Sequence, residues 1–399
     1  MIKLLSLFSG IGAFETALRR GGHEYQLIGY CEIDKYAANA YSQIHGVSEN
    51  YNLVDVTKVN TVLMDDVDLI TYGFPCQDIS AAGKQRGFED KDGNRTRSGL
   101  FFEALRIIEE TRPLYAIAEN VKALTSKKFE KEFKTVLDSL DGAGYNNYWA
   151  VLNAKDYGIP QNRERVFIVS IRKDIDKGGF KFPEKMPLNI CVKDILENNV
   201  DEKYYINTEK ARQLIKKLLD KNRITGVEVC DATVNAPNVR DISNAIISRY
   251  DAGISNQRSW GTAVIEPLKI LQIGNLLPDA GRKFTNPQTG RVYDPDGLAP
   301  TLNTMQGGGR EPKIIEPHAN KIVRTSTIGK HETDDVHESY RIRKLTPREC
   351  FRLMGFTDAE FDRIKGVSNT QLYKQAGNSI VVNVLEAIFN RLLTEEEKA

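Results

Sequence analysis

The feature that most constrains the fold is a regular alternation of short apolar runs with amphipathic segments over residues 1–172. The runs are rich in β-branched and aromatic residues, and the segments between them carry apolar residues at helical spacing. Strands and helices in this order predict an α/β fold with a mostly parallel sheet and helices on both faces. Such a sheet binds ligands at the carboxyl ends of its strands. We expect strands at 4–8, 26–31, 67–72, 114–119, 148–153 and 165–171, and helices at 14–20, 35–44, 100–110 and 131–140.

From about residue 173 to 342 the sequence has a different character. Turn-forming residues multiply and the apolar runs become short, which indicates a second, smaller, loop-rich domain. One amphipathic helix is expected at 208–222, and its basic outer face is typical of a solvated surface. Helical periodicity returns after 343, with Thr346 as an N-cap and an apolar stripe over 377–393 that could dock against the first domain.

Composition places the chain among soluble globular proteins. It has 399 residues, 55 Lys and Arg against 54 Asp and Glu, and 41% hydrophobic residues. The net charge of +1 argues against a histone-like binder of polyanions, although local basic patches remain open. No apolar run is long enough to span a membrane, and no signal-peptide pattern begins the chain, so we expect a cytoplasmic protein. Five widely spaced cysteines without a CxxC pair predict neither disulfides nor a metal site.

A glycine-containing turn joins the first strand to the first helix. Gly10 and Gly12 would let the backbone approach a ligand, and the helix that follows offers free N–H groups. A tight turn without a ligand is an equally simple interpretation. Glu15 stands where the dinucleotide fingerprint has its third glycine, which disfavours a nicotinamide oxidoreductase.

Acidic residues follow the next two apolar runs. Glu32 comes directly after the second strand, where a carboxylate can accept hydrogen bonds from a ribose diol. Asp55 could accept a hydrogen bond from an exocyclic amine. Each could also be an ordinary solvated side chain, but their placement after successive strands favours a shared site.

The segment GFPCQDIS (73–80) contains the sharpest chemical feature. Pro75 fixes its own φ and restricts Phe74, so Cys76 is presented rigidly at the end of a strand, where a thiolate can act as a nucleophile. The alternative is a buried structural cysteine. The polar, glycine-containing and basic residues of 77–97 favour a functional loop that closes over a polyanion.

Further charged residues are expected at the same edge of the sheet. Glu119 ends the strand at 114–119, and Arg163 and Arg165 alternate at the start of another strand, so they project to the same side. Ordinary surface ion pairs would explain each of them separately. A nucleophile, a carboxylate and two guanidinium groups at one edge indicate a catalytic site.

These motifs together resemble the DNA (cytosine-5) methyltransferase family, of the bacterial or phage type. The resemblance covers nearly the whole chain outside 173–340, and it implies a Rossmann-like methyltransferase fold, S-adenosylmethionine as cofactor and double-stranded DNA as substrate. It also implies a catalytic domain of residues 1–175 plus 365–399 and a target-recognition domain of residues 176–364. The motifs are FSGIG, GFPCQ, ENV, QNRERV, RKLTPRECFRLMGF and QAGNSIVVNV.

The resemblance assigns roles position by position. Cys76 matches the nucleophile, Glu119 the carboxylate that binds the cytosine edge, Arg165 a partner of the ring carbonyl, and Arg163 a support for the closing loop. Ser6 departs from the pattern, because many members have an acidic residue there. Residues that match cofactor positions are Phe8, Gly10, Gly12, Glu32, Asp55, Leu100 and Asn378. Residues that match substrate contacts are Pro75, Gln77, Thr301 and Leu302.

The chemistry supports the same interpretation. Carbon 5 of cytosine becomes nucleophilic when a thiolate adds to carbon 6, and neither atom is reachable until the base leaves the helical stack. We expect a monomer, with a cognate restriction endonuclease as partner if it belongs to a restriction–modification system. A tRNA-directed enzyme and a catalytically silent DNA-binding homologue are the alternatives. The full set of Cys76, Glu119 and Arg165 argues against the silent homologue.

Overall fold

The computed structural model describes most of the chain and divides it into two compact units. The first unit holds the described residues up to 189 and from 347 onward, and the second holds those from 190 to 346. The functional boundaries predicted at 175/176 and 364/365 stay a prediction, because compactness alone does not assign a role. The described residues are 1–64, 66–75, 88, 96–204, 272–275, 291–293, 299–300, 313–317 and 340–393.

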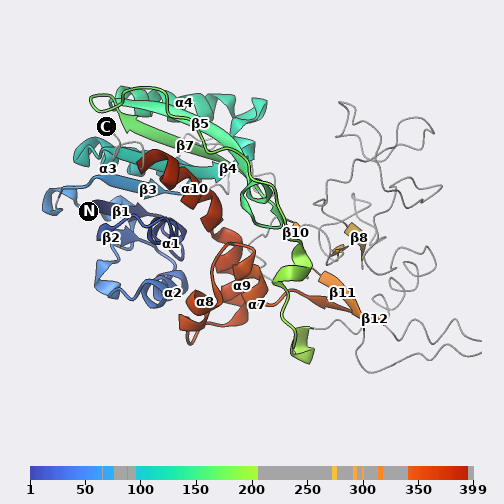
Figure 1. Cartoon of the computed structure of the whole chain (residues 1–399). Coiled ribbons are helices and arrows are strands. Elements are labelled where there is room, and N and C mark those ends of the chain that lie inside the picture. Colours follow the sequence, from blue (N-terminus) through green and yellow to red (C-terminus); the bar gives the residue numbers. More distant parts are fainter. Residues whose placement is uncertain are drawn as a thin grey trace, which may run out of the picture. The chain divides into compact units, whose positions relative to one another are not determined.

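A six-stranded sheet forms the centre of the first unit (Figure 1). Its order is β2-β1-β3-β4-β7-β5, and it contains all six strands expected from the sequence, which confirms the α/β prediction. β7 runs antiparallel to both neighbours, because the short connection after β5 allows a hairpin but not a crossover. The strands are β1 (Ile2–Leu7), β2 (Tyr25–Cys31), β3 (Leu69–Tyr72), β4 (Tyr115–Val121), β5 (Tyr145–Asn153) and β7 (Glu164–Arg172), with a short β6 (Gln161–Asn162) before β7.

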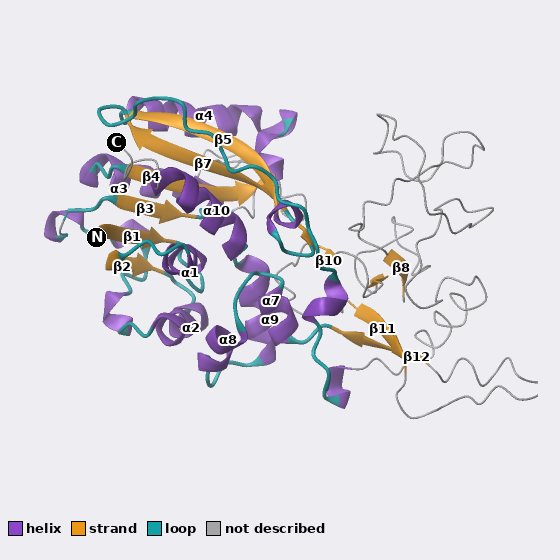
Figure 2. Cartoon of the chain, in the orientation of Figure 1, coloured by secondary structure: helices purple, strands orange, loops and turns teal. Residues whose placement is uncertain are grey.

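Helices cover both faces of this sheet (Figure 2). The four helices expected between the strands are present, and the apolar stripe predicted over 377–393 falls mostly on α10, which begins shortly after α9 ends at Asn378. The extended backbone of Ser379 ends α9. None of the described helices has the length and apolar character needed to cross a membrane. The helices are α1 (Ala13–Arg20), α2 (Lys35–His45), α3 (Phe101–Thr111), α4 (Glu130–Gly142), α7 (Pro347–Arg352), α8 (Asp358–Arg363), α9 (Asn369–Asn378) and α10 (Val382–Leu393).

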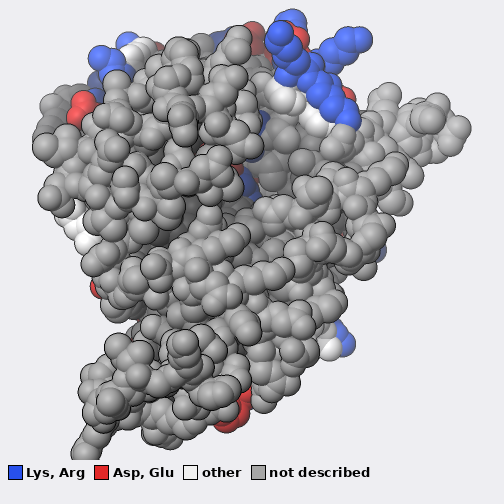
Figure 3. Space-filling model, turned by 90° about the vertical axis from the view of Figure 1, so that its right-hand side faces the viewer, with Lys and Arg blue, Asp and Glu red and all other residues white. Residues whose placement is uncertain are grey.

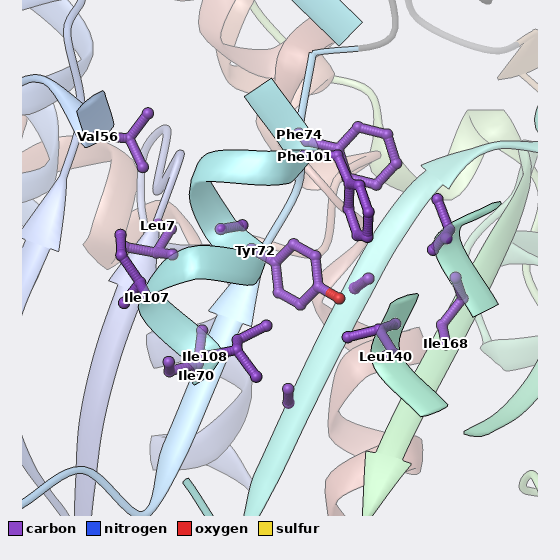
Figure 4. Packing of buried hydrophobic residues seen from close by; sticks show 14 of the residues in the cluster. Leu7, Val56, Ile70, Tyr72, Phe74, Phe101, Ile107, Ile108, Leu140 and Ile168 are labelled. Carbon is purple, nitrogen blue, oxygen red and sulfur yellow. The ribbon is translucent and has the colours of Figure 1, made fainter. Parts of the chain in front are cut away.

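The main hydrophobic core lies between the sheet and helices α3 and α4 (Figure 4). Ile70 and Tyr72 of β3 pack with Ile108 of α3 and Leu140 of α4. Elsewhere in this unit α1 packs against α10, where the rings of Phe14 and Phe389 lie 6.3 Å apart. The apolar stripe predicted for the C-terminal helix is buried, as expected for a docked element; its residues are Val381, Val384, Leu385 and Ile388.

The second unit contains a four-stranded sheet of order β12-β11-β9-β8. The helix expected at 208–222 lies outside the described residues. The strands of this unit are β8 (Gln272–Asn275), β9 (Arg291–Tyr293), β10 (Ala299–Pro300), β11 (Lys313–Pro317) and β12 (Tyr340–Lys344), and it also has short 3₁₀ turns at Val192–Ile195 and Glu202–Tyr204.

The core contains a matched pair of buried tyrosines that should respond oppositely to loss of the hydroxyl. The Tyr72 hydroxyl has no hydrogen-bond partner among the described residues, whereas the Tyr145 hydroxyl donates to the Pro113 carbonyl at 2.8 Å. Tyr72→Phe removes an unsatisfied polar group and should leave the free energy of unfolding unchanged or raise it by about 1 kcal/mol. Tyr145→Phe should lower it by about 1 kcal/mol. Urea titration of both variants measures the difference, and a larger loss in Tyr72→Phe would contradict the assignment.

Candidate active site

The register of the sheet brings the ends of four neighbouring strands to one edge. Leu7 at the end of β1 pairs with Cys31 at the end of β2 and with Tyr72 at the end of β3. Tyr72 in turn pairs with Ala118 of β4, so Glu119 follows at the same level. The predicted site residues after these strands therefore share the carboxyl edge of the sheet.

The turn between β1 and α1 is held in an unusual backbone conformation. Phe8, Gly10 and Gly12 all have positive φ angles, of 54°, 57° and 79°. This conformation is strained for Phe8, and such strain persists only where the surroundings enforce it. The Ser9 N–H donates to the Cys31 carbonyl at 3.0 Å, which fixes the turn against β2. A Cβ atom at Gly10 would have no atom of the described residues within 4 Å, so the backbone there faces open space in this part of the structure.

Gly12 is required for a different reason, because α2 presses against it. A Cβ atom at Gly12 would lie 2.0 Å from His45 Nε2 and 2.9 Å from the Tyr41 ring. His45 Nε2 is also 3.1 Å from the Ile11 carbonyl, and Arg19 lies 3.2 Å from its Nδ1. Arginine can only donate, so Nδ1 accepts and the ring proton sits on Nε2, from which it is donated to Ile11. A neutral histidine therefore clamps the turn.

Glu32 contacts this turn, and Asp55 lies close enough to Cys31, at the end of β2, to affect its pKa. Glu32 Oε2 accepts from the Gly10 N–H at 2.9 Å, and Oε1 accepts from the Asp34 N–H at 2.7 Å. Burial raises the pKa of Glu32, and these backbone donors partly oppose that shift. Asp55 caps a 3₁₀ turn by accepting from the Thr57 N–H at 3.0 Å. One carboxylate thus contacts the turn, and a second lies near the end of the neighbouring strand β2.

Apolar side chains complete this part of the edge. Phe8 and Leu100, the last residue of the 3₁₀ turn Arg97–Leu100, pack against the main core. Ile33, next to Glu32, is 73% exposed, which is unusual for a large aliphatic side chain. Acceptors, open space and an exposed apolar surface together suit a ligand that carries both hydroxyl groups and a flat ring.

A buried ion pair lies at the end of β4. Arg165 Nε is 3.1 Å from Glu119 Oε1, and the two side chains are only 17% and 12% exposed. Burial raises the pKa of Glu119, although the neighbouring Arg165 and Arg163 oppose the shift. Oε1 has no well-aligned hydrogen bond among the described residues, so the carboxyl keeps capacity for a further partner. Glu119 and Arg165 therefore lie in contact, as the sequence predicted.

Asn120 connects this pair to the segment that carries the cysteine. Its buried amide Nδ2 donates to the Phe74 carbonyl at 3.0 Å, and the Phe74 ring packs 5.4 Å from Phe101 in the core. Pro75, the next residue, is half-buried. The remaining predicted residues of this part, Cys76, Gln77, Thr301 and Leu302, lie outside the described residues.

Arg163 is buried and contacts the C-terminal end of α9. Its Nη2 donates to the carbonyls of Gly377 at 3.3 Å and Ser379 at 2.7 Å. These two carbonyls flank Asn378, which is exposed at the last position of α9. Arg163 therefore positions the end of α9, and its predicted support of the closing loop stays a prediction.

Sequence reasoning assigned no role to several residues that shape this edge. Asn120 belongs to the recognised motif ENV. An amide side chain at the end of an apolar strand was the signal that could have indicated its role. His45 lies on the helical stripe of α2, where it is indistinguishable from a core residue. Ser6, which stands where many family members have an acidic residue, has an acidic neighbour in Glu15. The buried Glu15 carboxyl interacts with the Ser6 hydroxyl, and the Tyr41 hydroxyl donates to Glu15 Oε1 at 2.8 Å. Burial raises the pKa of Glu15.

His45 should make stability depend on pH. Burial, together with Arg19 and Arg363, lowers its pKa from 6.5 to about 4, while Glu360 and the Ile11 carbonyl act in the opposite direction. Because the unfolded chain binds the proton more readily, stability is lost as the pH falls from about 6.5 toward about 4. Between about pH 7 and about pH 5 the free energy of unfolding should fall by about 2 kcal/mol more in the parent than in His45→Gln. An equal loss of unfolding free energy in the two proteins, measured by urea titration, would contradict a buried neutral His45.

Comparison with known proteins gives a consistent result. The sequence profile described as C-5 cytosine-specific DNA methylase matches residues 2–394. The chain is 34% identical to the orphan methyltransferase M.SPBetaI of Bacillus phage SPbeta, with 98% of this chain and 97% of the relative covered. It is 31% identical to the type II methyltransferase M.HhaI of Haemophilus parahaemolyticus, over 97% of this chain and 93% of the relative.

Solved structures agree on the fold. The S. pombe Dnmt2 methyltransferase superimposes with a TM-score of 0.62 at 19% identity, and the two chains are covered completely. A putative DNA modification methyltransferase encoded within a prophage (E. coli) gives 0.58 at 20% identity, also over both whole chains. The predicted Rossmann-like methyltransferase fold is confirmed.

Proposed function

The chain belongs to the family of C-5 cytosine-specific DNA methylases, and from this premise we propose that it methylates a cytosine turned out of duplex DNA through a covalent bond to Cys76. Enzymes of this family use S-adenosylmethionine, so the chain is an S-adenosylmethionine-dependent DNA (cytosine-5) methyltransferase. The covalent mechanism is supported by the buried Glu119–Arg165 pair. Asn120, next to Glu119, connects this pair to the segment that leads to Cys76.

The residues around the glycine turn fit S-adenosylmethionine. The open space at Gly10 leaves room for a ligand against the backbone, and Glu32 and Asp55 supply acceptors suited to a ribose diol and an exocyclic amine. Exposed Ile33 offers an apolar surface for the adenine ring. The remaining walls of the cofactor pocket would be formed by Phe8, Gly12, Leu100 and Asn378. The bound cofactor would supply an electrophilic methyl group attached to a sulfonium.

The protein's own residues would activate the cytosine. The Cys76 thiolate adds to carbon 6, which makes carbon 5 nucleophilic. Negative charge develops on the ring during this addition. A protonated Glu119 would donate to nitrogen 3, and the Arg165 guanidinium would stabilise the ring carbonyl oxygen. The raised pKa of buried Glu119 supports this role, because the reaction needs the protonated form.

The reaction also requires access to the base. Carbon 5 and carbon 6 are covered by stacking in a duplex, so the target nucleotide must rotate out into the site. We assign residues 176–364 to target recognition, with Thr301 and Leu302 among the DNA contacts and Pro75 and Gln77 next to the base. Arg163 would keep the end of α9 in place during this step.

Replacing Cys76 tests the nucleophile directly. Transfer of a labelled methyl group from S-adenosylmethionine to duplex DNA should be lost by more than about 10³-fold in Cys76→Ser, because the serine hydroxyl is not ionised near neutral pH. Total tRNA serves as the competing substrate. Label that appears only in RNA would overturn the DNA assignment, and a variant as fast as the parent would exclude Cys76 as the nucleophile.

The covalent bond has a separate readout. Release of the enzyme requires loss of the proton on carbon 5 after methylation, and a fluorine at that position cannot leave as a cation. Duplex DNA that contains 5-fluorocytosine should therefore retain the parent protein on a denaturing gel. Retention of Cys76→Ser to the same extent would contradict the adduct.

A further inference from the structure

A lysine-rich segment directly follows the strand that carries Glu119. We call residues 122–131 the lysine segment. It carries four lysines and one acidic residue, although the whole chain is nearly neutral. These residues are Lys122, Lys127, Lys128, Lys131 and Glu130.

The backbone of the lysine segment is fixed by burial. It forms two 3₁₀ turns, Lys122–Thr125 and Lys127–Phe129, followed by the start of α4. Leu124 and Phe129 are buried in the main core, and the Phe129 N–H donates to the Ser126 carbonyl at 2.9 Å. With its apolar residues anchored, the segment exposes its lysines on a rigid platform, which lowers the entropy lost when they bind a ligand.

The lysine segment begins at the rim of the candidate active site. Val121, the last residue of β4, pairs with Arg165 of β7, the partner of Glu119. Lys122 Nζ lies 2.9 Å from both carboxylate oxygens of Glu164, the neighbour of Arg165. At a rise of about 3.3 Å per residue, Lys122 is about 10 Å along the chain from Glu119. A nucleotide whose base reaches Glu119 would bring its phosphates to this distance.

Beyond this rim, the exposed Lys127 adds a charge that no carboxylate of the described residues neutralises. On the face drawn in Figure 3, described Lys and Arg side chains lie along the upper edge, with Asp and Glu side chains among them. Duplex DNA carries one negative charge per about 1.7 Å of its axis, so it complements such a platform.

We propose that Lys127 and Lys128 contact phosphates of duplex DNA beside the target nucleotide, and that the lysine segment is a sequence-independent DNA contact of the catalytic unit. This inference rests on the proposed function. Phosphate contacts fix the position of the duplex without reading bases, so the segment would hold the DNA over the site whatever sequence is recognised elsewhere in the chain.

The salt dependence of DNA binding tests this inference. The affinity of the full chain for a short duplex of mixed sequence is measured over a range of salt concentrations. Each lost phosphate contact lowers the slope of log K against log salt by about 0.9, so Lys127→Gln/Lys128→Gln should lower its magnitude by about 2. Binding of S-adenosylhomocysteine should be unchanged in this variant, since the lysine segment follows β4 and the glycine turn follows β1, with β3 between these two strands.

A matched control comes from the opposite edge of the sheet. Lys173 and Lys177 are exposed and follow the end of β7, whose Ile171 pairs with Tyr115 at the start of β4, about 20 Å from Val121. Lys173→Gln/Lys177→Gln makes the same change in net charge and should retain the parent slope. Equal slopes in the two double variants would overturn the lysine segment as the contact. A parent that bound no duplex DNA would overturn the proposed function itself.

Discussion

The candidate site depends on a carboxylate and a guanidinium that are buried together at the edge of a sheet. Such a pair is costly to desolvate, and removing one partner would leave the other charge uncompensated. The antiparallel pairing of β4 and β7 makes the pair possible, because it places Arg165 diagonally opposite Glu119 on the same face. Asn120, which follows Glu119 in the chain, then holds Phe74 and fixes the path of the chain toward the cysteine. Stability and the proposed chemistry therefore rely on the same strand ends.

A second constraint acts on the glycine turn. His45 presses on Gly12, and Arg19, which polarises His45, also pairs with Glu360 of α8 at 2.6 Å. Lys374 of α9 pairs with Asp34 at the start of α2. The turn that would hold the cofactor is thus supported by helices from the C-terminal part of the chain. This explains why the last helices belong to the same compact unit as the first strands.

Periodicity was sufficient to predict the six strands, the helices between them and the edge that carries the site. It could not show how the chain between α9 and α10 is held, because Arg163, which donates to the carbonyls of Gly377 and Ser379, lies more than 200 residues away in sequence. His45 was missed because a helical stripe does not reveal which residue contacts a neighbouring turn. Base recognition was beyond reach for a related reason: irregular segments have no period that fixes the direction of their side chains.

The protonation state of Glu119 is the most direct test of the account, and single-turnover methyl transfer measured against pH reports it. Burial raises the pKa of this carboxyl, so the protonated form persists above its usual range and is lost as the pH rises further. The account predicts that the parent rate falls on the alkaline side and that Glu119→Gln, although slower, lacks this fall. The same alkaline fall in both proteins would contradict it.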